Sequence, residues 1–296
     1  MSTGPTDRTV DVGGTRIRVR ESGDPAGEPV LLLHGIGRSL EDWDPQHPYL
    51  SEYRVVAVDL AGFGYSDRVP GPATLEKLAD TALATLDALG ETRPAHVLGN
   101  SLGGAVALLI STRHPQRVAS LVLADPAGFG AEVTPSLRVL GVPVLGRFLL
   151  GHLDARAARR AERSLFVDGS LVTDERVARA VEIGKRPEFV QTFAEIAAEL
   201  GTVRGVRPGW RRALLDAAAR APKPTLVVWG ERDLILPAAQ LRTAARLPQV
   251  TTHVFGRVGH MPQIEVPEAF ATLALDHLAR AGRRTSISSE NRAGTR

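Results

Sequence analysis

Short apolar runs alternate with longer segments of helical periodicity along most of the chain. Residues 30–33 and 55–58 are apolar at every position, a pattern typical of strands buried on both faces of a sheet. Seven such runs predict strands at Arg16–Arg20, Pro29–Leu33, Arg54–Asp59, Ala95–Gly99, Val118–Ala124, Thr225–Trp229 and Thr251–Phe255. Helices are predicted at about Thr74–Leu89, Leu102–Arg113, Ala238–Ala245 and Pro267–Arg280. This alternation predicts the α/β class, with a mostly parallel sheet of about eight strands and helices on both faces.

The alternation breaks between about residues 131 and 221. Here Phe189, Phe193 and Ile196 recur at helical spacing, and Leu137–Leu153 is apolar but interrupted by glycine and proline. These features favour a helical cap that is inserted into the core domain. The alternative is that these helices pack against the core in the ordinary way. The predicted organisation is core residues 1–130, cap residues 131–221, core residues 222–281 and a tail of residues 282–296.

Composition and charge narrow the function classes. The chain has 296 residues and no cysteine, which excludes disulfides, thiolate metal sites and a cysteine nucleophile. The net charge is +3, and residues 282–296 carry four arginines against one glutamate. This polar segment without periodicity is expected to be a disordered, solvated basic tail and not a nucleic-acid-binding arm.

Membrane and metal patterns are missing from the sequence. No apolar run approaches the roughly 18 residues that would span a bilayer, and the first residues do not resemble a secretory signal. We therefore expect a cytoplasmic protein that acts on a small molecule. The histidines form no cluster with metal-ligand spacing, so no metal site and no cofactor are predicted. Nothing in the sequence predicts an oligomeric state.

The strongest chemical signal is Gly99-Asn100-Ser101-Leu102-Gly103, placed between a predicted strand and a predicted helix. A sharp strand-to-helix turn exposes a serine in a strained conformation, and flanking glycines prevent collisions with neighbouring backbone. The helix N-terminus also favours developing negative charge. The alternative interpretation is a tight turn with a helix-capping serine.

A second signal, His34-Gly35-Ile36-Gly37, follows the predicted strand Pro29–Leu33. Its glycines would let the backbone curl toward Ser101. The N–H groups of Ile36 and Leu102 could then bind an oxyanion together. His34 is interpreted as a structural residue that hydrogen-bonds this loop.

Two further side chains follow predicted strands near the end of the chain. Asp233 lies in Gly230-Glu231-Arg232-Asp233, and His260 follows Gly259. Both are in loops at the carboxyl ends of strands, where open α/β sheets place their ligand sites. Asp125, after the strand Val118–Ala124, is a competing acid whose plain role is a turn residue. We favour Asp233.

Taken together, these motifs resemble the α/β-hydrolase superfamily over about residues 15–280, including Asp59–Asp67 as a domain-shaping loop. The order Ser101, Asp233, His260 matches the chain order of that fold. The resemblance implies a serine hydrolase in which Ser101 attacks a carbonyl carbon, His260 takes its proton and Asp233 orients the histidine.

Within the superfamily, the serine at the turn disfavours dehalogenases and epoxide hydrolases, which use an aspartate there. The Gly-Asn-Ser-x-Gly-Gly form and Asp125–Gly130 resemble carbon–carbon hydrolases of meta-ring-fission products. Those enzymes carry a tryptophan after the catalytic histidine, whereas this chain has Met261. We therefore expect a carboxylic ester hydrolase for a small to medium, largely apolar substrate. A carbon–carbon hydrolase and a non-catalytic ligand receptor are the alternatives.

The sequence also suggests substrate contacts. Asn100 and Met261 flank the predicted nucleophile and base, and Phe148 lies in the apolar part of the predicted cap. A carbon–carbon hydrolase would in addition need an arginine to hold a carboxylate. The candidates in the cap are Arg138, Arg147 and Arg186.

Overall fold

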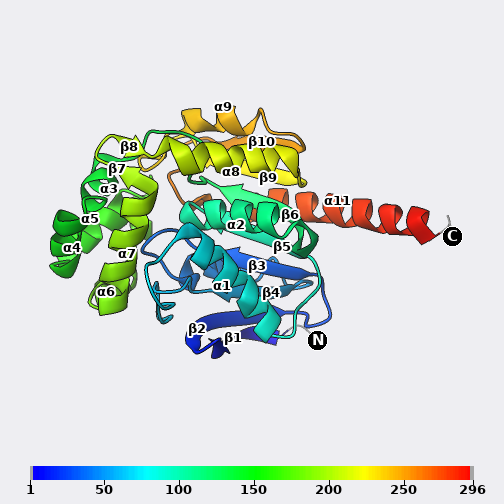
Figure 1. The fold of residues 1–296 in the computed structure, drawn as a ribbon, viewed down its shortest axis with the longest axis horizontal. Helices are drawn as coiled ribbons and strands as arrows, with labels where there is room; N and C mark the ends of the chain where they lie inside the picture. The colour runs from blue at the N-terminus through cyan, green and yellow to red at the C-terminus, as the bar shows by residue number, and fades with distance from the viewer. Residues whose placement is uncertain (1–2, 294–296) are drawn as a thin grey trace.

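A twisted eight-stranded sheet forms the centre of the computed structural model, which describes residues 3–293. The strand order is β1-β2-β4-β3-β5-β6-β9-β10, and every neighbouring pair from β4 to β10 is parallel. Figure 1 shows the sheet with helices in front of and behind it. The strands are β1 Thr3–Val12, β2 Thr15–Gly23, β3 Pro29–Leu33, β4 Arg54–Val58, β5 Ala95–Asn100, β6 Val118–Ala124, β9 Thr225–Gly230 and β10 Val250–Phe255. The predicted fold class is confirmed.

The strand β1 was not predicted. It pairs antiparallel with β2 across a turn in which Gly13 and Gly14 both have positive φ, as tight hairpin turns require. Most of its side chains are exposed. An edge strand of this kind has no apolar run, so hydrophobic patterning does not reveal it.

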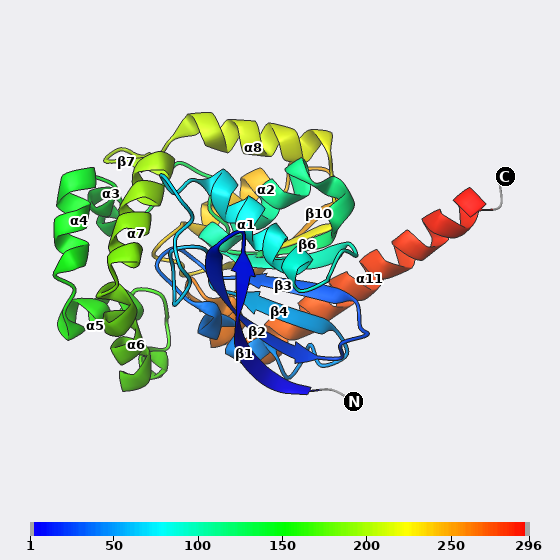
Figure 2. The same ribbon diagram turned by 60° about the horizontal axis from the view of Figure 1, so that its bottom comes forward.

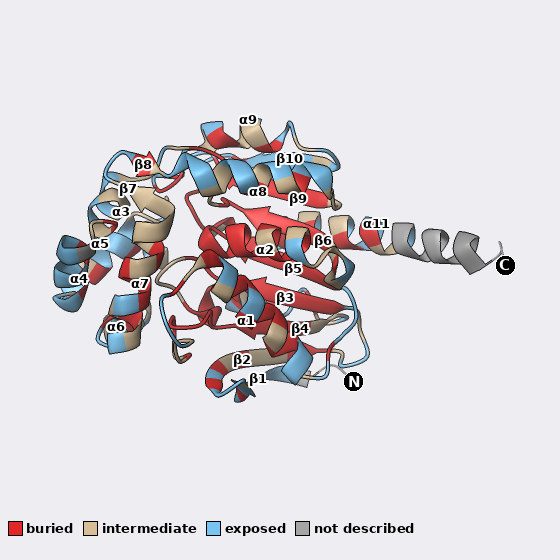
Figure 3. Ribbon diagram, in the orientation of Figure 1, coloured by how far each residue is buried: buried red, intermediate tan, exposed pale blue. Residues whose placement is uncertain are grey.

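Helices cover both faces of the sheet and divide the core in two. The first cluster joins the sheet to α1, α2, α8 and α9 through residues such as Leu78, Val106 and Leu214. The second joins the opposite face to η1 and α11 through Trp43 and Phe270. Figure 3 shows the central strands β3, β5, β6 and β9 as almost continuously buried. The core helices are η1 Leu40–Gln46, α1 Leu75–Ala88, α2 Leu102–Arg113, α8 Pro208–Arg220, α9 Leu241–Ala244, α10 Pro262–Glu265 and α11 Pro267–Ala293.

A separate helical group lies at one end of the molecule, beyond the sheet (Figures 1 and 2). The segment 131–221 divides between this group and the core, because α8 packs against α2. The group itself comprises α3 Pro135–Leu140, α4 Pro143–Gly151, α5 Ala155–Arg163, α6 Asp174–Gly184, α7 Pro187–Leu200 and the short strands β7 Gly201–Thr202 and β8 Gly205–Val206. We call these elements the cap.

The C-terminal segment differs from the disordered tail expected for residues 282–296. Helix α11 continues as far as Ala293, while residues 294–296 lie outside the described part. Phe270 and Leu278 bury the first turns of this helix against the core. Once a helix is nucleated, each further residue is added at low cost. The polar composition of residues 282–296 therefore did not reveal where helix α11 ends.

Four charged side chains connect the cap to the core at the loop after β3. Arg38 pairs with Asp42 (2.7 Å between Nη2 and Oδ1) and with Glu162 of α5. Arg176 of α6 pairs with the same Glu162 (3.1 Å) and Asp42 (3.2 Å). The two carboxylates are almost fully buried. Each charge thus has two opposite partners in a region of little solvent screening.

We expect Glu162→Ala to destabilise the protein because it leaves Arg38 and Arg176 with Asp42 alone. Removing one partner of a buried ion pair typically costs several kcal/mol, and partial exposure of the arginines lowers the expected loss to about 2–3 kcal/mol. Urea unfolding measures it. The control, Arg159→Ala, removes a pair with the highly exposed Asp174 and should cost less than about 1 kcal/mol. Equal losses would contradict a stabilising role for the buried network.

Candidate active site

The strained turn at Ser101 connects β5 to α2. Ser101 has φ 55° and ψ −115°, a conformation that costs a non-glycine residue about 1–3 kcal/mol. Its N–H donates to Ala124 O (3.0 Å), and its carbonyl accepts from the N–H groups of Gly104 (3.0 Å) and Ala127 (2.9 Å). These bonds to β6, α2 and the following loop hold the turn in place.

Close backbone packing explains the glycines around Ser101. A Cβ on Gly103 would collide with the carbonyl oxygens of Leu33 and His34, and a Cβ on Gly99 would collide with the backbone of Gly103. Both positions therefore exclude any side chain. The spacing of glycines in the sequence marks where α2 approaches β3 and β5.

Asp233 and His260 meet across the loops after β9 and β10. The carboxylate Oδ2 of Asp233 lies 2.7 Å from Nδ1 of His260. The other oxygen, Oδ1, accepts hydrogen bonds from the N–H groups of Ile235 (2.7 Å) and Leu236 (3.0 Å). Both side chains are buried. The carboxylate is thus fixed by its own loop and can hold one orientation of the imidazole.

Asn100 connects the serine turn to the histidine loop. Its Nδ2 donates to Ala124 O (3.1 Å) and to His260 O (3.0 Å), and the residue is 1% exposed. Both amide hydrogens are therefore used within the protein. The structure gives Asn100 a structural role, whereas the sequence also allowed a substrate contact.

Ile36 and Leu102 both line the cleft beside Ser101. Leu102 is the first residue of α2, and N–H groups in the first turn of a helix have no carbonyl partner within it. The loop with Ile36 is held by His34, whose Nδ1 lies 2.7 Å from Gly35 O and whose Nε2 accepts from Leu60 N–H. Burial lowers the pKa of His34 to about 4, so this histidine is neutral and structural.

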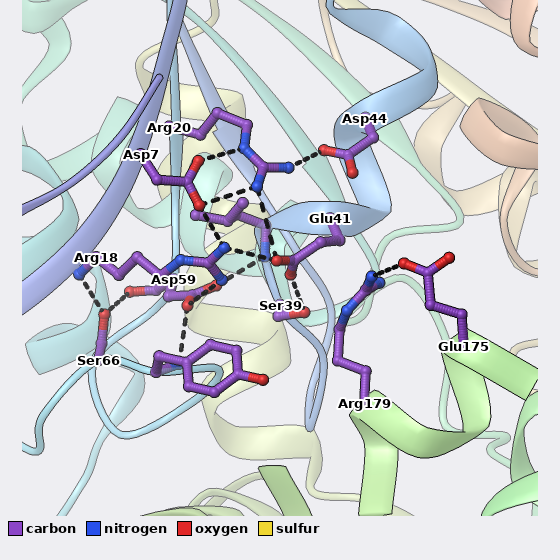
Figure 4. Close-up of polar contacts among 12 residues, drawn as sticks. Asp7, Arg18, Arg20, Ser39, Glu41, Asp44, Asp59, Ser66, Glu175 and Arg179 are labelled. Atoms are coloured by element: carbon purple, nitrogen blue, oxygen red, sulfur yellow. Dashed lines mark hydrogen bonds and ion pairs between the residues drawn. The ribbon is translucent and has the colours of Figure 1, made fainter. Parts of the chain in front are cut away.

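A second polar network supports the same loop from the side of β2 (Figure 4). Asp59 accepts hydrogen bonds from the N–H groups of Leu40 (2.7 Å) and Tyr65 (2.8 Å), and Arg18 donates to it at 3.4 Å. Burial raises the pKa of Asp59 to about 6, against the lowering effect of these bonds. The network joins the loop after β4 to η1 and shapes the domain without facing the cleft.

The cleft beside Ser101 is mostly apolar and partly open to solvent. Arg138 is the charged residue in its lining. Its Nε donates to Val133 O (2.9 Å), and within residues 3–293 its terminal nitrogens bond no protein group. The lining comprises Ile36, Ser101, Leu102, Ala127, Val133, Leu137, Arg138, Ala197, Leu200, Gly201, Thr202, Val206, Trp210, Ile235 and Leu236.

Two expected substrate contacts lie elsewhere. Phe148 is on the outside of α4, 61% exposed, with its ring against His152. Met261 is 1% exposed and packs with Phe166 and Ile264 between cap and core. Neither residue lines the cleft. An apolar sequence segment predicts helical packing but does not tell which face of the helix points inward.

Asp125 lies next to the Asp233–His260 pair. It is fully buried, has φ 46° and accepts a hydrogen bond from Gly230 N–H (2.9 Å) through Oδ1. Within the described chain, its Oδ2 has no hydrogen-bond partner. Burial and the charge of Asp233 raise the pKa of Asp125 well above its ordinary value. The raised pKa favours the protonated form of Asp125, which can donate a proton toward Asp233.

The same three residues form the group of potential metal donors found in the described chain. One atom each of Asp125, Asp233 and His260 lies within 4.8 Å of the others. The bond between Asp233 and His260 Nδ1 uses two of these positions. This arrangement fits an acid–base pair with a neighbouring carboxyl group whose pKa is raised.

Glu265 is a site residue that the sequence did not reveal. Its Oε2 accepts from Gly259 N–H, and its Oε1 accepts from the N–H groups of Val167 and Asp168 in the cap, all at 2.9 Å. The cap also contacts His260 directly, since the backbone N–H of His260 donates to Leu165 O (2.7 Å). Backbone partners of this kind leave no sequence signal, because any residue can offer them.

Residues 28–267 match the model described as "alpha/beta hydrolase fold". The chain belongs to the α/β-hydrolase fold family. The superfamily resemblance noted in the sequence is therefore confirmed. In the described residues, no helix of this α/β hydrolase is long and apolar enough to cross a membrane.

Several known proteins are similar to this α/β hydrolase over most of its length. A 2-hydroxymuconate semialdehyde hydrolase of Pseudomonas sp. strain CF600 is 35% identical over 93% of this chain and 94% of its own. The dihydrolipoyllysine-residue acetyltransferase component of an acetoin cleaving system from Pseudomonas putida is 34% identical over 90% of this chain and 67% of its own. A meta-cleavage product hydrolase from Pseudomonas fluorescens IP01 superposes with a TM-score of 0.77 at 29% identity, covering 93% and 98% of the two chains.

Matched substitutions can distinguish the roles of the Asp233 and Asp125 carboxyl groups. Asp233→Asn should lower kcat for a simple ester by up to about 10⁴-fold, because the amide favours the wrong tautomer of His260. Asp125→Asn should lower kcat much less, since an amide there can still accept from Gly230 N–H and donate toward Asp233. Steady-state kinetics of the two folded variants tests this. The opposite ranking would make Asp125 the orienting acid.

Stability against pH gives an independent test of the Asp125 proton. With its pKa raised, folded Asp125 holds a proton that the unfolded chain has lost, so its contribution to stability falls as pH rises above about 4. We expect Asp125→Asn to gain stability relative to wild type by up to about 1.4 kcal/mol per pH unit until the folded pKa is reached. Urea unfolding from pH 5 to pH 8 measures the slope. A difference independent of pH would contradict a raised pKa of Asp125 in the folded protein.

Proposed function

We propose that this protein is a serine hydrolase in which Ser101 is the nucleophile, His260 the base and Asp233 the group that orients the base. The strained turn at Ser101 beside an apolar cleft supports the first role. The 2.7 Å bond between Asp233 and His260 supports the other two. In this mechanism His260 takes the Ser101 proton as Oγ attacks a carbonyl carbon.

The N–H groups of Ile36 and Leu102 would stabilise the oxyanion of the tetrahedral intermediate, a contribution typically worth about 3–4 kcal/mol for one donor. Protonated His260 then gives its proton to the leaving group, and an acyl-enzyme forms on Ser101. Water loses a proton to His260 and releases the acyl group. Asp233 stabilises the imidazolium during both steps.

For the substrate, we propose the carbon–carbon bond of a 2-hydroxy-6-oxo-dienoate. Relatives named for such hydrolases are 31–35% identical over most of both chains, which outweighs the sequence-based preference for an ester. The observation that carries the proposal is the cleft: it is apolar apart from Ser101, Thr202 and one guanidinium, that of Arg138. Such a lining suits a molecule with one carboxylate and an apolar remainder.

Ser101 and His260 would also carry out this carbon–carbon cleavage. The dienoate first ketonises, so that the carbon that departs can leave as an enolate. The bond between the attacked carbonyl carbon and its neighbour breaks, and its electron pair enters that enolate, which takes a proton from His260. Hydrolysis of the acyl-enzyme yields a carboxylic acid.

Ester hydrolysis is the second candidate, supported by Met261. This residue is buried against Phe166 and Ile264, so it offers no flat surface to a conjugated dienoate at the cleft. An apolar acyl chain would need no such surface. The 34% identical relative named as an acetyltransferase component is also consistent with acyl chemistry on a simpler substrate.

The two candidates are separated by measuring kcat/KM for a 2-hydroxy-6-oxo-dienoate and for esters of graded acyl length on the same preparation. We expect the dienoate to lose its visible absorbance with the higher efficiency. Ser101→Ala should abolish both activities while remaining folded, because the change removes only Oγ and leaves no buried charge. A preference for esters would establish the second candidate. A single turnover followed by arrest would indicate a ligand receptor.

Arg138 should determine the preference for an anionic substrate. Arg138→Met keeps an unbranched apolar stem and removes the guanidinium charge, so kcat/KM for the dienoate should fall about 10–100-fold, mainly through KM. Neutral esters should be affected little. Arg147→Met, a change at an exposed arginine of α4 outside the cleft lining, is the control. Equal effects on dienoate and ester would contradict a carboxylate contact.

A further inference from the structure

The outer helices of the cap expose an unusual number of large apolar side chains. Five of the nine exposed large hydrophobic residues of the described chain lie within residues 139–149. On α4, Val144 is 83% exposed and Phe148 is 61% exposed, and Leu145 and Leu149 are exposed as well. Soluble surfaces rarely gather such residues unless they bind something.

The next helix, α5, presents a cluster of arginines. Arg156, Arg159, Arg160 and Arg163 line an open hollow together with Gly169 and Val172. Arg159 pairs with Asp174, which is 94% exposed. Within residues 3–293, Arg156 and Arg160 have no acidic partner. Their charges are therefore available to an anion.

Two of the four arginines have acidic neighbours, since Arg159 pairs with Asp174 and Arg163 lies near the carboxylate of Asp168, but the segment that carries the cluster has an excess of basic residues. Residues 133–163 contain six arginines and only Asp154 and Glu162. Glu162 is buried in the network with Arg38, and Asp154 caps α5 by accepting from Ala157 N–H (2.7 Å). The surface of this segment is thus both cationic and apolar.

Helices α4 and α5 follow one another at the end of the cap, in both views opposite the end where α11 projects (Figures 1 and 2). Figure 3 shows both as largely exposed. We propose that this outer surface of the cap, formed by α4 and α5, docks on an anionic lipid bilayer. Apolar side chains of α4 would enter the interface, and the arginines of α5 would bind lipid phosphates.

The chemistry favours a bilayer over other occupants. Interfacial binding combines buried apolar area with attraction to anionic headgroups, and arginine binds phosphate oxygens through paired hydrogen bonds. A symmetric contact with a second copy would place the unpaired arginines of two chains near each other. A nucleic acid would use the arginines but leave Val144 and Phe148 in water.

This surface adjoins the cleft. Helix α3 contributes Leu137 and Arg138 to the cleft lining, while Val139 of the same helix is exposed and precedes α4. A docked cap would therefore hold the cleft near a membrane in which apolar molecules accumulate. The docking itself does not depend on which bond the site cleaves.

The test is co-sedimentation of the full chain with vesicles of phosphatidylcholine alone and of phosphatidylcholine with an equal amount of phosphatidylglycerol. We expect binding to the anionic vesicles only, weakened by salt. The double variants Val144→Ser/Phe148→Ser and Arg156→Glu/Arg160→Glu should each lower the partition coefficient by about tenfold or more.

Matched controls change exposed residues elsewhere. Val203→Ser alters a residue as exposed as Phe148, at 61%, and Arg212→Glu/Arg220→Glu alters two exposed arginines of α8. Both controls should bind as wild type does, and all variants should keep the wild-type melting temperature. Absence of binding, equal loss in the controls, or a lipid-free dimer abolished by Phe148→Ser would overturn the proposal, the last by assigning the surface to a second copy.

Discussion

The close approach of α2 to the sheet at Gly99 and Gly103 is the constraint on which the site depends. Because neither position has room for a side chain, β5 can turn directly into α2, and Ser101 is held with positive φ at the edge of the cleft. The strain is balanced by bonds from this turn to β6 and by Asn100, which also ties it to the backbone of His260. The reactive groups are thus placed by backbone contacts more than by their own side chains.

Charge serves two purposes around this turn. The pairs among Arg38, Asp42, Glu162 and Arg176, together with the carboxylate of Glu265, join the cap to the loops that carry Ile36 and His260. The buried carboxyl groups of Asp125 and Asp233 also lie close together. In a low-dielectric environment only one of the two can be charged at low cost. The cap is therefore coupled to the site electrostatically, and a rearrangement of the cap would disturb both loops.

Much of the architecture follows from the sequence. Buried parallel strands are apolar at consecutive positions, so the ends of β3, β4, β5, β6 and β9 could be predicted within one residue, and the glycines around Ser101 marked the turn. The exposed strand β1 and the continuation of α11 to Ala293 have no such pattern. The pairing of Asp233 with His260 could be anticipated because strand ends of a parallel sheet meet at one edge.

The tertiary structure decided what the local pattern could not. Helical periodicity predicts an apolar face but not its partner, so Phe148 was expected in the cleft and lies outside, while Met261 lies buried between cap and core. Contacts between segments more than 100 residues apart in the chain decide which arginine reaches the cleft. Such contacts also place Asp125 beside Asp233. The sequence determined the residues available for chemistry, whereas long-range packing determined which of them face one another, because burial and charge are properties of the folded surroundings.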